Sequence, residues 1–498
     1  MMNRHNALLT LATSLLMCAP LQASPAPETE ALYQQHCASC HGADRLGGMG
    51  PALLPQNLSR LKQPAAEAVI RNGQPATQMP AFADMLGPES ITALADYIYR
   101  APANTPTWDQ AAILDSHLLP HPQGSLPDKP VYQADMMNLF LVVETGDHHV
   151  TLLDGDKMEP IHRFASRFAL HGGPKYSPDG RYVYFGSRDG WVTKFDLYNL
   201  KVTAEVRAGI NMRNIAVSAD GKYVMAANYL PHTLVLFDAA DLTLVDVIPV
   251  ENDAGDSSRV SAVYAAPPRN SFIAALKDIP EAWEISVQDG EAQIRRMQTD
   301  TWLDDFFFDS GYQHLIGAAR DGKRGYVINL DTGTTVAELP LPGMPHLGSG
   351  VTWESQGRRV MATPHLGTGA VSIIDMETWK VIKTLKTEGP GFFMRSHENS
   401  PYAWVDVFFG PNQDKVHVID KQTLEIVKTL QPAPGKVAAH VEFDRYGKKL
   451  LLSIWEKDGA VIVYDAETLE EEKRIPMNKP SGKYNVWNKI NYEEGTSH

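Results

Sequence analysis

The segment Cys37-Ala-Ser-Cys40-His41 holds the side chains with the clearest chemistry in this chain of 498 residues. Two thiols three residues apart can bond to the two vinyl groups of one porphyrin, and the histidine that follows then lies under the iron. A zinc site would need two more suitable ligands, and the chain has no second cysteine pair. A redox dithiol would need a βαβ setting, whereas the flanks are expected to be helical. The motif therefore predicts a covalent haem c, one per chain, with His41 as an iron ligand.

Met79 is expected to be the second iron ligand of this haem. It lies in the proline-bounded loop Gln78-Met-Pro-Ala-Phe82, between a segment at 65–72 and a helix expected over 88–100. Small cytochromes c close their haem pocket with a methionine placed before the last helix. Ligation by His and Met raises the reduction potential and suits an electron relay. Met49, in a glycine-rich stretch, is the rival ligand.

A second group of candidate residues consists of histidines in the long C-terminal part of the chain, namely His171, His346, His365 and His440. Two glycines follow His171 and let a bulky group approach the backbone. A single loop histidine is usually bonded to a carbonyl, but four in corresponding loops favour a shared site. Three arginines in comparable loops suit bidentate binding of carboxylates: Arg188, Arg213 and Arg395. Together these residues favour a flat, polyanionic ligand that binds imidazole, which is a second, non-covalent haem.

The elements that position these loops repeat eight times between residues 135 and 498. Each copy is a hydrophobic strand that ends at an acidic or polar turn, and the copies begin at Val150, Val192, Leu234, Ala282, Tyr326, Val371, Val416 and Val461. Tight turns precede most copies, and Gly180 and Gly221 of two such turns are 41 residues apart. A period of about 40 to 50 residues with short strands predicts a β-propeller of eight blades rather than seven. This fold alone does not identify a function.

The chain is expected to divide into four parts. Residues 1–23 have the basic start, short apolar run and small final residue of an export signal, so we expect a periplasmic protein. A lipid anchor on Cys18 is the alternative. Residues 24–103 are predicted to form a small all-α cytochrome c domain, 104–134 a proline-rich linker, and 135–498 the all-β propeller. No stretch is long enough to span a membrane, and a formal charge of −14 disfavours nucleic-acid binding.

An exported c-type cytochrome joined to an eight-bladed propeller resembles the cytochrome cd1 nitrite reductases and their relatives, over nearly all of the mature chain. Local matches are Ser187-Arg-Asp189, Gly209-Ile-Asn-Met-Arg213, His365-Leu-Gly-Thr-Gly369, Leu452-Ser-Ile-Trp455 and Gly482-Lys-Tyr-Asn485. The resemblance implies that His171 is the proximal ligand of a haem d1 iron. It also implies a set of side chains around the macrocycle: Arg188, Arg213, Tyr229, His365, Arg395, Trp455 and Asn485.

The chain departs from the reductases at two positions. The reductases place two histidines over the distal face to protonate nitrite; His346 matches the second, but Asp304 stands at the first. Conversely, His440 stands where the reductases have no histidine. This pattern resembles the dihydro-haem d1 dehydrogenases of the NirN type, which oxidise a propionate side chain to an acrylate. The related NirF-type proteins lack the cytochrome domain.

The resemblance implies a periplasmic dehydrogenase of haem d1 biosynthesis, with dihydro-haem d1 as substrate and haem d1 as product. His346 and His440 are expected to take the two protons, with Asp304 as an orienting partner, while electrons pass to haem c. The implied protein partners are a cytochrome cd1 nitrite reductase, which accepts the finished cofactor, and other haem d1 assembly proteins. The alternatives are a true nitrite reductase, a haem d1 carrier without chemistry, and a propeller enzyme of unrelated chemistry.

Overall fold

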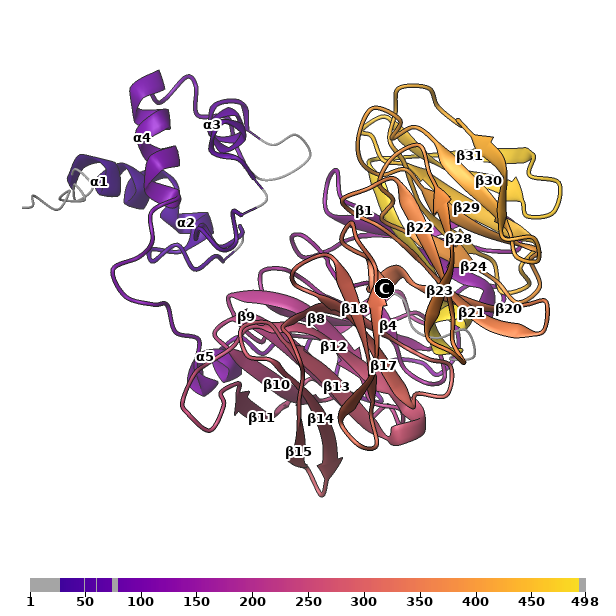
Figure 1. Ribbon diagram of the computed structural model, residues 1–498. Helices are drawn as coiled ribbons and strands as arrows, with labels where there is room; N and C mark the ends of the chain where they lie inside the picture. Colours follow the sequence, from indigo (N-terminus) through magenta and orange to yellow (C-terminus); the bar gives the residue numbers. More distant parts are fainter. Residues whose placement is uncertain (1–26, 49, 60, 74–78, 492–498) are drawn as a thin grey trace, which may run out of the picture.

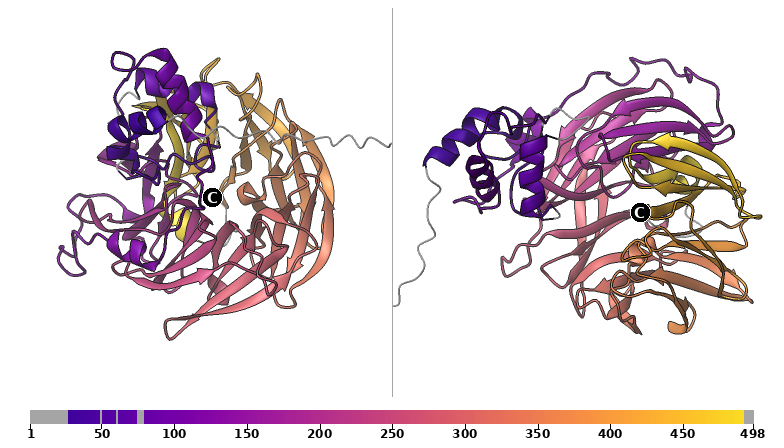
Figure 2. Two further views of the ribbon diagram at one scale, coloured as in Figure 1. Left: turned by 90° about the vertical axis from the view of Figure 1, so that its left-hand side faces the viewer. Right: turned by 90° about the horizontal axis from the view of Figure 1, so that it is seen from above.

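The computed structural model describes residues 27–48, 50–59, 61–73 and 79–491. The expected export signal and the rival haem ligand Met49 lie outside these residues. A small helical unit lies beside a ring of β-sheets (Figures 1 and 2). No helix in the described part of the chain is both long and apolar enough to cross a membrane.

The N-terminal unit is built from short helices: α1 (Pro27–His36), α2 (Ala38–His41), α3 (Gln63–Asn72) and α4 (Pro88–Ile98). Prolines in the first turns of α3 and α4 hold φ at a helical value. The apolar face of α4 packs on the other helices through a core that includes Tyr33, Ile70, Ile91, Leu94 and Ile98. The helix predicted after the Met79 loop is confirmed, as is the all-α class of this unit, and the segment before the loop is also helical.

The segment between the two units contains regular structure and contacts the propeller. It contains α5 (Gln110–Asp115), whose first turn is capped by the Asp109 carboxylate, which accepts a hydrogen bond from the Ala112 N–H. Beyond this helix, Leu118 pairs with Glu205 on an outer strand of the propeller. The segment therefore follows the propeller surface, where α5 contacts the outer strands β7 and β11 (Figure 1).

Within the described residues the C-terminal part forms eight antiparallel sheets of four strands each. From the inner strand outward, four sheets are β32 (Pro480–Asn485), β1 (Leu139–Glu144), β2 (His149–Asp154), β3 (Glu159–Ala165); β4 (Lys175–Tyr176), β5 (Tyr182–Gly186), β6 (Trp191–Asp196), β7 (Lys201–Arg207); β8 (Asn211–Val217), β9 (Tyr223–Leu230), β10 (Thr233–Asp238), β11 (Leu244–Pro249); and β12 (Val260–Ala266), β13 (Ser271–Leu276), β14 (Glu281–Gln288), β15 (Glu291–Gln298). The other four are β16 (Leu303–Phe308), β17 (His314–Ala319), β18 (Arg324–Asn329), β19 (Thr334–Pro340); β20 (Val351–Ser355), β21 (Arg358–Pro364), β22 (Ala370–Asp375), β23 (Lys380–Lys386); β24 (Met394–Ser396), β25 (Tyr402–Asp406), β26 (Val416–Asp420), β27 (Glu425–Leu430); and β28 (Ala438–Phe443), β29 (Lys449–Ile454), β30 (Gly459–Asp465), β31 (Glu471–Met477). Short helices η1 (Met136–Asn138), η2 (Pro267–Arg269), η3 (Leu347–Ser349) and α6 (Val486–Ile490) complete the described part.

The prediction of eight blades is confirmed, and each of the eight sequence repeats lies on the third strand of its blade, from β2 to β30. The acidic residue that ends a repeat shapes the turn to the fourth strand. Asp375, for example, accepts hydrogen bonds from the N–H groups of Glu377 and Thr378. The fourth repeat lacks a glycine in its preceding turn because Asn270 takes the left-handed conformation there, with φ of 50°.

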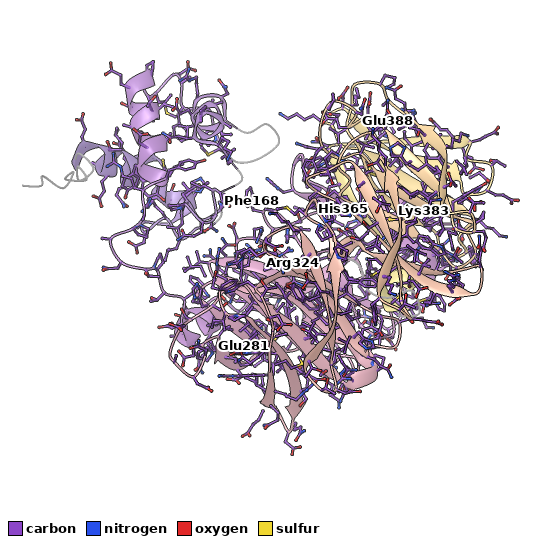
Figure 3. All side chains as sticks on the ribbon, in the orientation of Figure 1. Phe168, Glu281, Arg324, His365, Lys383 and Glu388 are labelled. Carbon is purple, nitrogen blue, oxygen red and sulfur yellow. The ribbon has the colours of Figure 1, made fainter. Side chains whose placement is uncertain are left out.

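The ring closes because β32, the last strand of the chain, pairs with β1, the first. The inner strands of neighbouring blades contact one another around a central channel, for example β4 with β8 and β8 with β12. Side chains fill the space between adjacent blades (Figure 3), where apolar clusters draw on two blades at a time. We refer below to the end of the channel at which the inner strands begin as the strand-start end.

Closure should be sensitive to packing in the first blade. Phe140 lies on β1, fully buried between β32 and β2, and belongs to a cluster shared with the last blade. We expect Phe140→Ala to lower the free energy of unfolding by about 3 to 5 kcal/mol. Val427, half-exposed on the outer strand β27, is the matched control, and Val427→Ala should cost less than about 1 kcal/mol. Denaturant titration followed by tryptophan fluorescence measures both, and equal losses would contradict the packing argument.

Candidate functional site

The thiols of Cys37 and Cys40 and the imidazole of His41 lie together at α2. His41 is buried, and its Nδ1–H donates a hydrogen bond of 2.8 Å to the Pro51 carbonyl, which leaves Nε2 for an iron ion. Met79 packs against the same core as Cys37. Two free thiols with an oriented imidazole and a thioether form the donor set of a c-type haem, so the residues present fit that group.

Four blades carry a β-bulge at the strand-start end of the inner strand, and the extra residue of each bulge is Arg213 on β8, Ser261 on β12, Asp304 on β16 and His440 on β28. A bulge leaves one residue without a partner on the neighbouring strand. At that residue the regular alternation of side chains between the two faces of the sheet is interrupted. Three of these four residues were predicted from the sequence to belong to the site. The bulges therefore aim their side chains around one end of the channel.

His171 and Arg213 are in direct contact. The Nδ1–H of His171 donates to the Arg213 carbonyl at 2.8 Å, and the Arg213 guanidinium lies 3.3 Å from Nε2. Arg213 also donates from Nε to the Ser261 carbonyl at 2.8 Å. The same guanidinium nitrogen lies 3.1 Å from Nδ1, so Arg213 packs against the imidazole ring, and the hydrogen bond at Nδ1 leaves the Nε2 lone pair for an iron ion.

Cations surround the ring of Tyr229 at the same end of the channel. The Arg188 guanidinium lies 5.3 Å from the ring centroid, Arg259 lies 5.6 Å away, and the Lys277 ammonium lies 5.8 Å away. Arg188 also donates to the Met212 carbonyl at 3.3 Å. This cluster combines a flat aromatic face with positive charge, and it suits a planar ligand that carries carboxylates.

His346 lies beside Asp305 rather than Asp304. Its Nδ1–H donates to the Phe392 carbonyl at 2.6 Å, and its Nε2 lies 3.6 Å from an Asp305 oxygen. Burial lowers the pKa of His346 below 6.5, although Asp305 opposes this shift. Asp305 is further linked to the Tyr264 hydroxyl, which donates to it at 3.4 Å. The neutral His346 ring can therefore act as a base. Once this ring is protonated, the nearby Asp305 carboxylate stabilises its positive charge.

Asp304 points elsewhere. Its carboxylate accepts from Lys277 at 2.9 Å and from Arg320 at 3.3 Å, and its side chain is 37% exposed. Asp304 is the extra residue of the bulge and has no partner on β17, whereas Asp305 pairs with Ala318, so the two neighbouring carboxylates lie in different surroundings. The carboxylate beside His346 in this structure is thus Asp305, and the role of Asp304 as an orienting partner stays a prediction.

Asp406 connects the surroundings of the two candidate bases. One oxygen of this fully buried carboxylate accepts from the N–H groups of Phe392 and Phe393, at 2.8 and 3.0 Å, and the other accepts from His440 N–H at 3.0 Å. Phe392 stacks against His346 with ring centroids 4.3 Å apart, and Phe393 against His440 at 4.6 Å. Burial raises the pKa of Asp406 to about 6. A single carboxylate thus fixes the backbone beside both histidines.

The His440 ring also contacts β32, the strand that closes the propeller. His440 adopts φ of 53° at its bulge, and its Nδ1 accepts a long hydrogen bond of 3.3 Å from the N–H of Lys483 on β32. Tyr484 packs edge-on against the ring. The ring is therefore positioned by the strand that closes the propeller.

Three predicted contacts of the macrocycle are occupied with other partners. His365 is buried and bonds through Nε2 to the Ser372 hydroxyl at 2.9 Å. Asn485 is the last residue of β32 and so lies opposite the strand-start end of the channel. Its side chain caps α6 by accepting a hydrogen bond from the Asn488 N–H. Trp455 donates a hydrogen bond to the Thr145 hydroxyl at 3.0 Å. Its ring packs against that of Phe408, with the ring centroids 5.5 Å apart.

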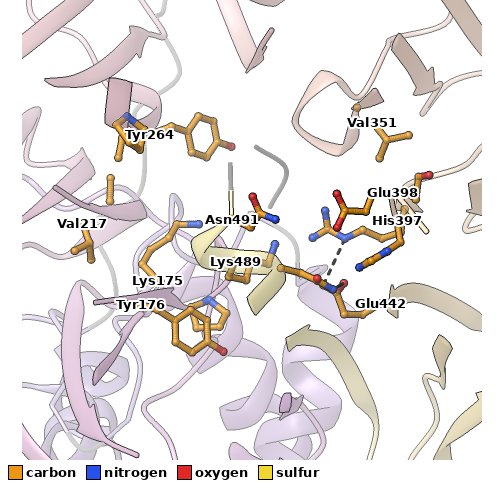
Figure 4. A pocket seen from close by; sticks show the side chains of 18 residues that line it. Lys175, Tyr176, Val217, Tyr264, Val351, His397, Glu398, Glu442, Lys489 and Asn491 are labelled. Atoms are coloured by element: carbon orange, nitrogen blue, oxygen red, sulfur yellow. Dashed lines mark hydrogen bonds and ion pairs between the residues drawn. The ribbon is translucent and has the colours of Figure 1, made fainter. Parts of the chain in front are cut away.

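The central channel also holds a cluster of charges that the sequence did not reveal. Lys175 and Lys489 point into one cavity, with Tyr264 across from them (Figure 4). Arg395, predicted to bind carboxylates, lines this cavity and lies 3.6 Å from the Glu442 carboxylate. Burial lowers the pKa of Lys175 to about 8. Because Tyr264 also donates to Asp305, the cavity adjoins the group around His346.

Comparisons with known proteins agree with this geometry. The family model described as "Cytochrome D1 heme domain" matches residues 134–489, and "Cytochrome C oxidase, cbb3-type, subunit III" matches 24–98. The chain is 58% identical over 492 residues to a dihydro-heme d1 dehydrogenase of Pseudomonas aeruginosa, covering 99% of this chain and 100% of that protein. It is 26% identical over 549 residues to a nitrite reductase of Stutzerimonas stutzeri, covering 97% of each. A solved structure of the dihydro-heme d1 dehydrogenase NirN in complex with DHE superposes with a TM-score of 0.91 at 59% identity, covering 93% of this chain and 100% of that one.

The role of Asp406 is open to a direct test. In Asp406→Asn the amide keeps one oxygen, so an N–H group must face either His440 N–H or the N–H groups of Phe392 and Phe393. We expect a loss of about 1 to 3 kcal/mol in the free energy of unfolding, because a buried donor is left unpaired. The same change at Asp458, an exposed residue paired with Lys436, should cost less than about 0.5 kcal/mol. Denaturant titration of both variants would contradict the argument if their losses were alike.

Proposed function

The chain belongs to the cytochrome d1 haem domain family, and from that premise we propose that it is a dehydrogenase of haem d1 biosynthesis that converts a propionate side chain of dihydro-haem d1 to an acrylate. The observation that carries this proposal is the pair His346 and His440, held on either side of the Phe392–Phe393 backbone by Asp406. Two imidazoles beside one backbone segment suit a reaction that removes two protons from neighbouring carbons. The similarity to a dehydrogenase over the full length of the chain supports the same reaction.

The protons are assigned to the histidines by their hydrogen bonds. His346 donates from Nδ1, so its neutral ring has a lone pair at Nε2 and can accept a proton there. The imidazolium so formed lies 3.6 Å from Asp305, which stabilises the charge. His440 accepts at Nδ1 from the Lys483 peptide, so its neutral ring carries hydrogen at Nε2. We assign one proton to Nε2 of His346, whereas His440 can take the other only at Nδ1, once the 3.3 Å hydrogen bond from the Lys483 N–H has opened.

The remaining site residues bind and orient the substrate. His171 would hold its iron through Nε2, and Arg188 and Arg213 would bind its carboxylates, with Tyr229 against the macrocycle. Arg395 would serve the same purpose from the channel side. Fixing the side chain against the bases supplies orientation, which is worth several powers of ten in rate. The reaction removes two electrons, and the haem c held by Cys37, Cys40, His41 and Met79 would accept them one at a time, passing each to an external acceptor.

The cellular setting is part of the proposal. The cysteine motif after a predicted export signal supports a periplasmic protein with one covalent haem. The finished haem d1 would then pass to a cytochrome cd1 nitrite reductase, with other haem d1 assembly proteins supplying the substrate.

Substitution of the histidines separates binding from chemistry. We expect His346→Ala and His440→Ala to bind dihydro-haem d1 with its bound absorption spectrum, yet to convert it about 10²- to 10⁴-fold more slowly. His171→Ala should instead change the axial-ligand spectrum and weaken binding. Each variant is mixed with dihydro-haem d1, and the spectrum and the acrylate product, by mass, are followed. Wild-type conversion in both His346→Ala and His440→Ala would remove these histidines from the mechanism, whereas binding without any acrylate product in the unsubstituted protein would identify a carrier of haem d1.

The alternative activity, nitrite reduction, is expected to be negligible even with mature haem d1 bound. Asp304 stands where the reductases place a proton-donating histidine, and its side chain accepts hydrogen bonds from Lys277 and Arg320. The measurement is nitric oxide release from nitrite with a chemical reductant, with a cytochrome cd1 nitrite reductase as positive control. Sustained turnover at a rate near that of the control would overturn the biosynthetic assignment.

A further inference from the structure

One peptide group touches both units of the protein. The Pro51 carbonyl accepts the hydrogen bond from His41 Nδ1–H at 2.8 Å, and the N–H of the same peptide group, that of Ala52, donates to the Asp189 carboxylate at 3.2 Å. Asp189 belongs to the turn between β5 and β6 in the propeller. The predicted haem ligand and a propeller carboxylate are thus the two hydrogen-bonding partners of a single peptide.

The groups that bond to the Pro51–Ala52 peptide on both sides are protected from water. His41, Ala52 and Asp189 are all buried, and a Cβ atom built on Gly50 would lie 2.7 Å from the His41 ring. The backbone before Pro51 is therefore packed directly on the imidazole, and only glycine allows that approach. In such a site of low dielectric constant, hydrogen bonds polarise one another along a chain.

Neighbouring contacts hold the loop in place on the propeller. Arg207 donates from Nε to the Asp189 carbonyl at 2.8 Å and from Nη2 to the Leu46 carbonyl at 2.5 Å. Asn57 donates to the Ile210 carbonyl at 3.0 Å. An apolar cluster spans the same boundary and contains Ala52, Leu54, Ile210 and Leu230. The interface is thus specific, and Asp189 is the carboxylate within it that reaches the haem-ligand peptide.

The residue before Asp189 is Arg188, which lies over Tyr229 in the candidate haem d1 site. The same four-residue turn, Ser187 to Gly190, therefore contacts the covalent-haem unit through one side chain and the second ligand pocket through the next.

We propose that Asp189 is a positioning residue for electron transfer, which anchors the Pro51–Ala52 peptide and, through it, sets both the placement of the His41 imidazole and the reduction potential of haem c. A carboxylate that accepts from the peptide N–H makes the carbonyl a stronger acceptor, and this increases the electron donation of His41 to an iron ion. The negative charge also favours the ferric state. This proposal deepens the proposed function, but its consequences are measurable without dihydro-haem d1.

The chain offers matched variants for the test. Asp189→Asn keeps an oxygen acceptor but removes the charge, whereas Asp189→Leu removes both. The control is Asp321→Asn, because Arg320-Asp321-Gly322 occupies the corresponding turn of another blade and Asp321 is paired with Arg324 of that blade. The holoprotein with covalent haem is titrated with redox mediators in the absence of dihydro-haem d1, and hydrogen exchange of the peptide covering 46–57 is followed by mass spectrometry.

We expect Asp189→Asn to raise the haem c potential while exchange of 46–57 stays slow. Asp189→Leu should raise the potential and also speed this exchange, and Asp321→Asn should change neither. If Asp189→Leu does not incorporate haem, the haem c potentials of Asp189→Asn and Asp321→Asn are compared, and this comparison still tests the proposal. A wild-type potential in Asp189→Asn and Asp189→Leu, or the same shift in Asp321→Asn, would overturn the proposal. Because neither readout involves conversion of dihydro-haem d1, this failure is distinguishable from failure of the dehydrogenase assignment.

Discussion

The candidate site depends on the pairing of β32 with β1, because this pairing turns a row of eight sheets into a closed ring. His171, His346 and His440 come from three different blades, so their separations are fixed only when the ring is complete. The closing strand also enters the site itself, since the Lys483 N–H on β32 bonds to His440. An open ring would leave two sheet edges unpaired and His440 without this partner.

Regular strands alone would not build the site, because alternation sends successive side chains to opposite faces of a sheet. The bulges at Arg213, Ser261, Asp304 and His440 interrupt the alternation on four inner strands at the same end of the channel. Each bulge forfeits a ladder pair, and the left-handed backbone at His440 adds strain. The surrounding hydrogen bonds, above all those of Asp406, offset this cost and keep the two histidines beside the same backbone segment.

The fold was predictable because its signals are periodic or local. The eight repeats mark the third strands of eight blades, and Cys37 to His41 is a contiguous motif whose chemistry needs no long-range information. The site was predictable only in outline. The contact of Asp305 with His346 was not predicted, because a bulge cannot be read from two adjacent aspartates. Asp406 was missed because it ends β25 much as other aspartates end strands, and its three N–H partners come from distant segments.

The distribution of charge joins these features to the proposed substrate. The chain has a formal charge of −14, yet its channel buries Lys175, Lys489 and Arg395 around one carboxylate, Glu442. Burial lowers the pKa of Lys175 to about 8, and that of Lys489 falls well below its ordinary value. A lysine whose folded pKa is lowered destabilises the fold as pH falls, and for Lys175 the full cost is present below about pH 8. At neutral pH Lys175 therefore keeps its charge at the expense of stability. Under the proposed function, the carboxylates of dihydro-haem d1 would bring the opposite charge to this cavity, and binding would relieve a cost that folding alone leaves in place.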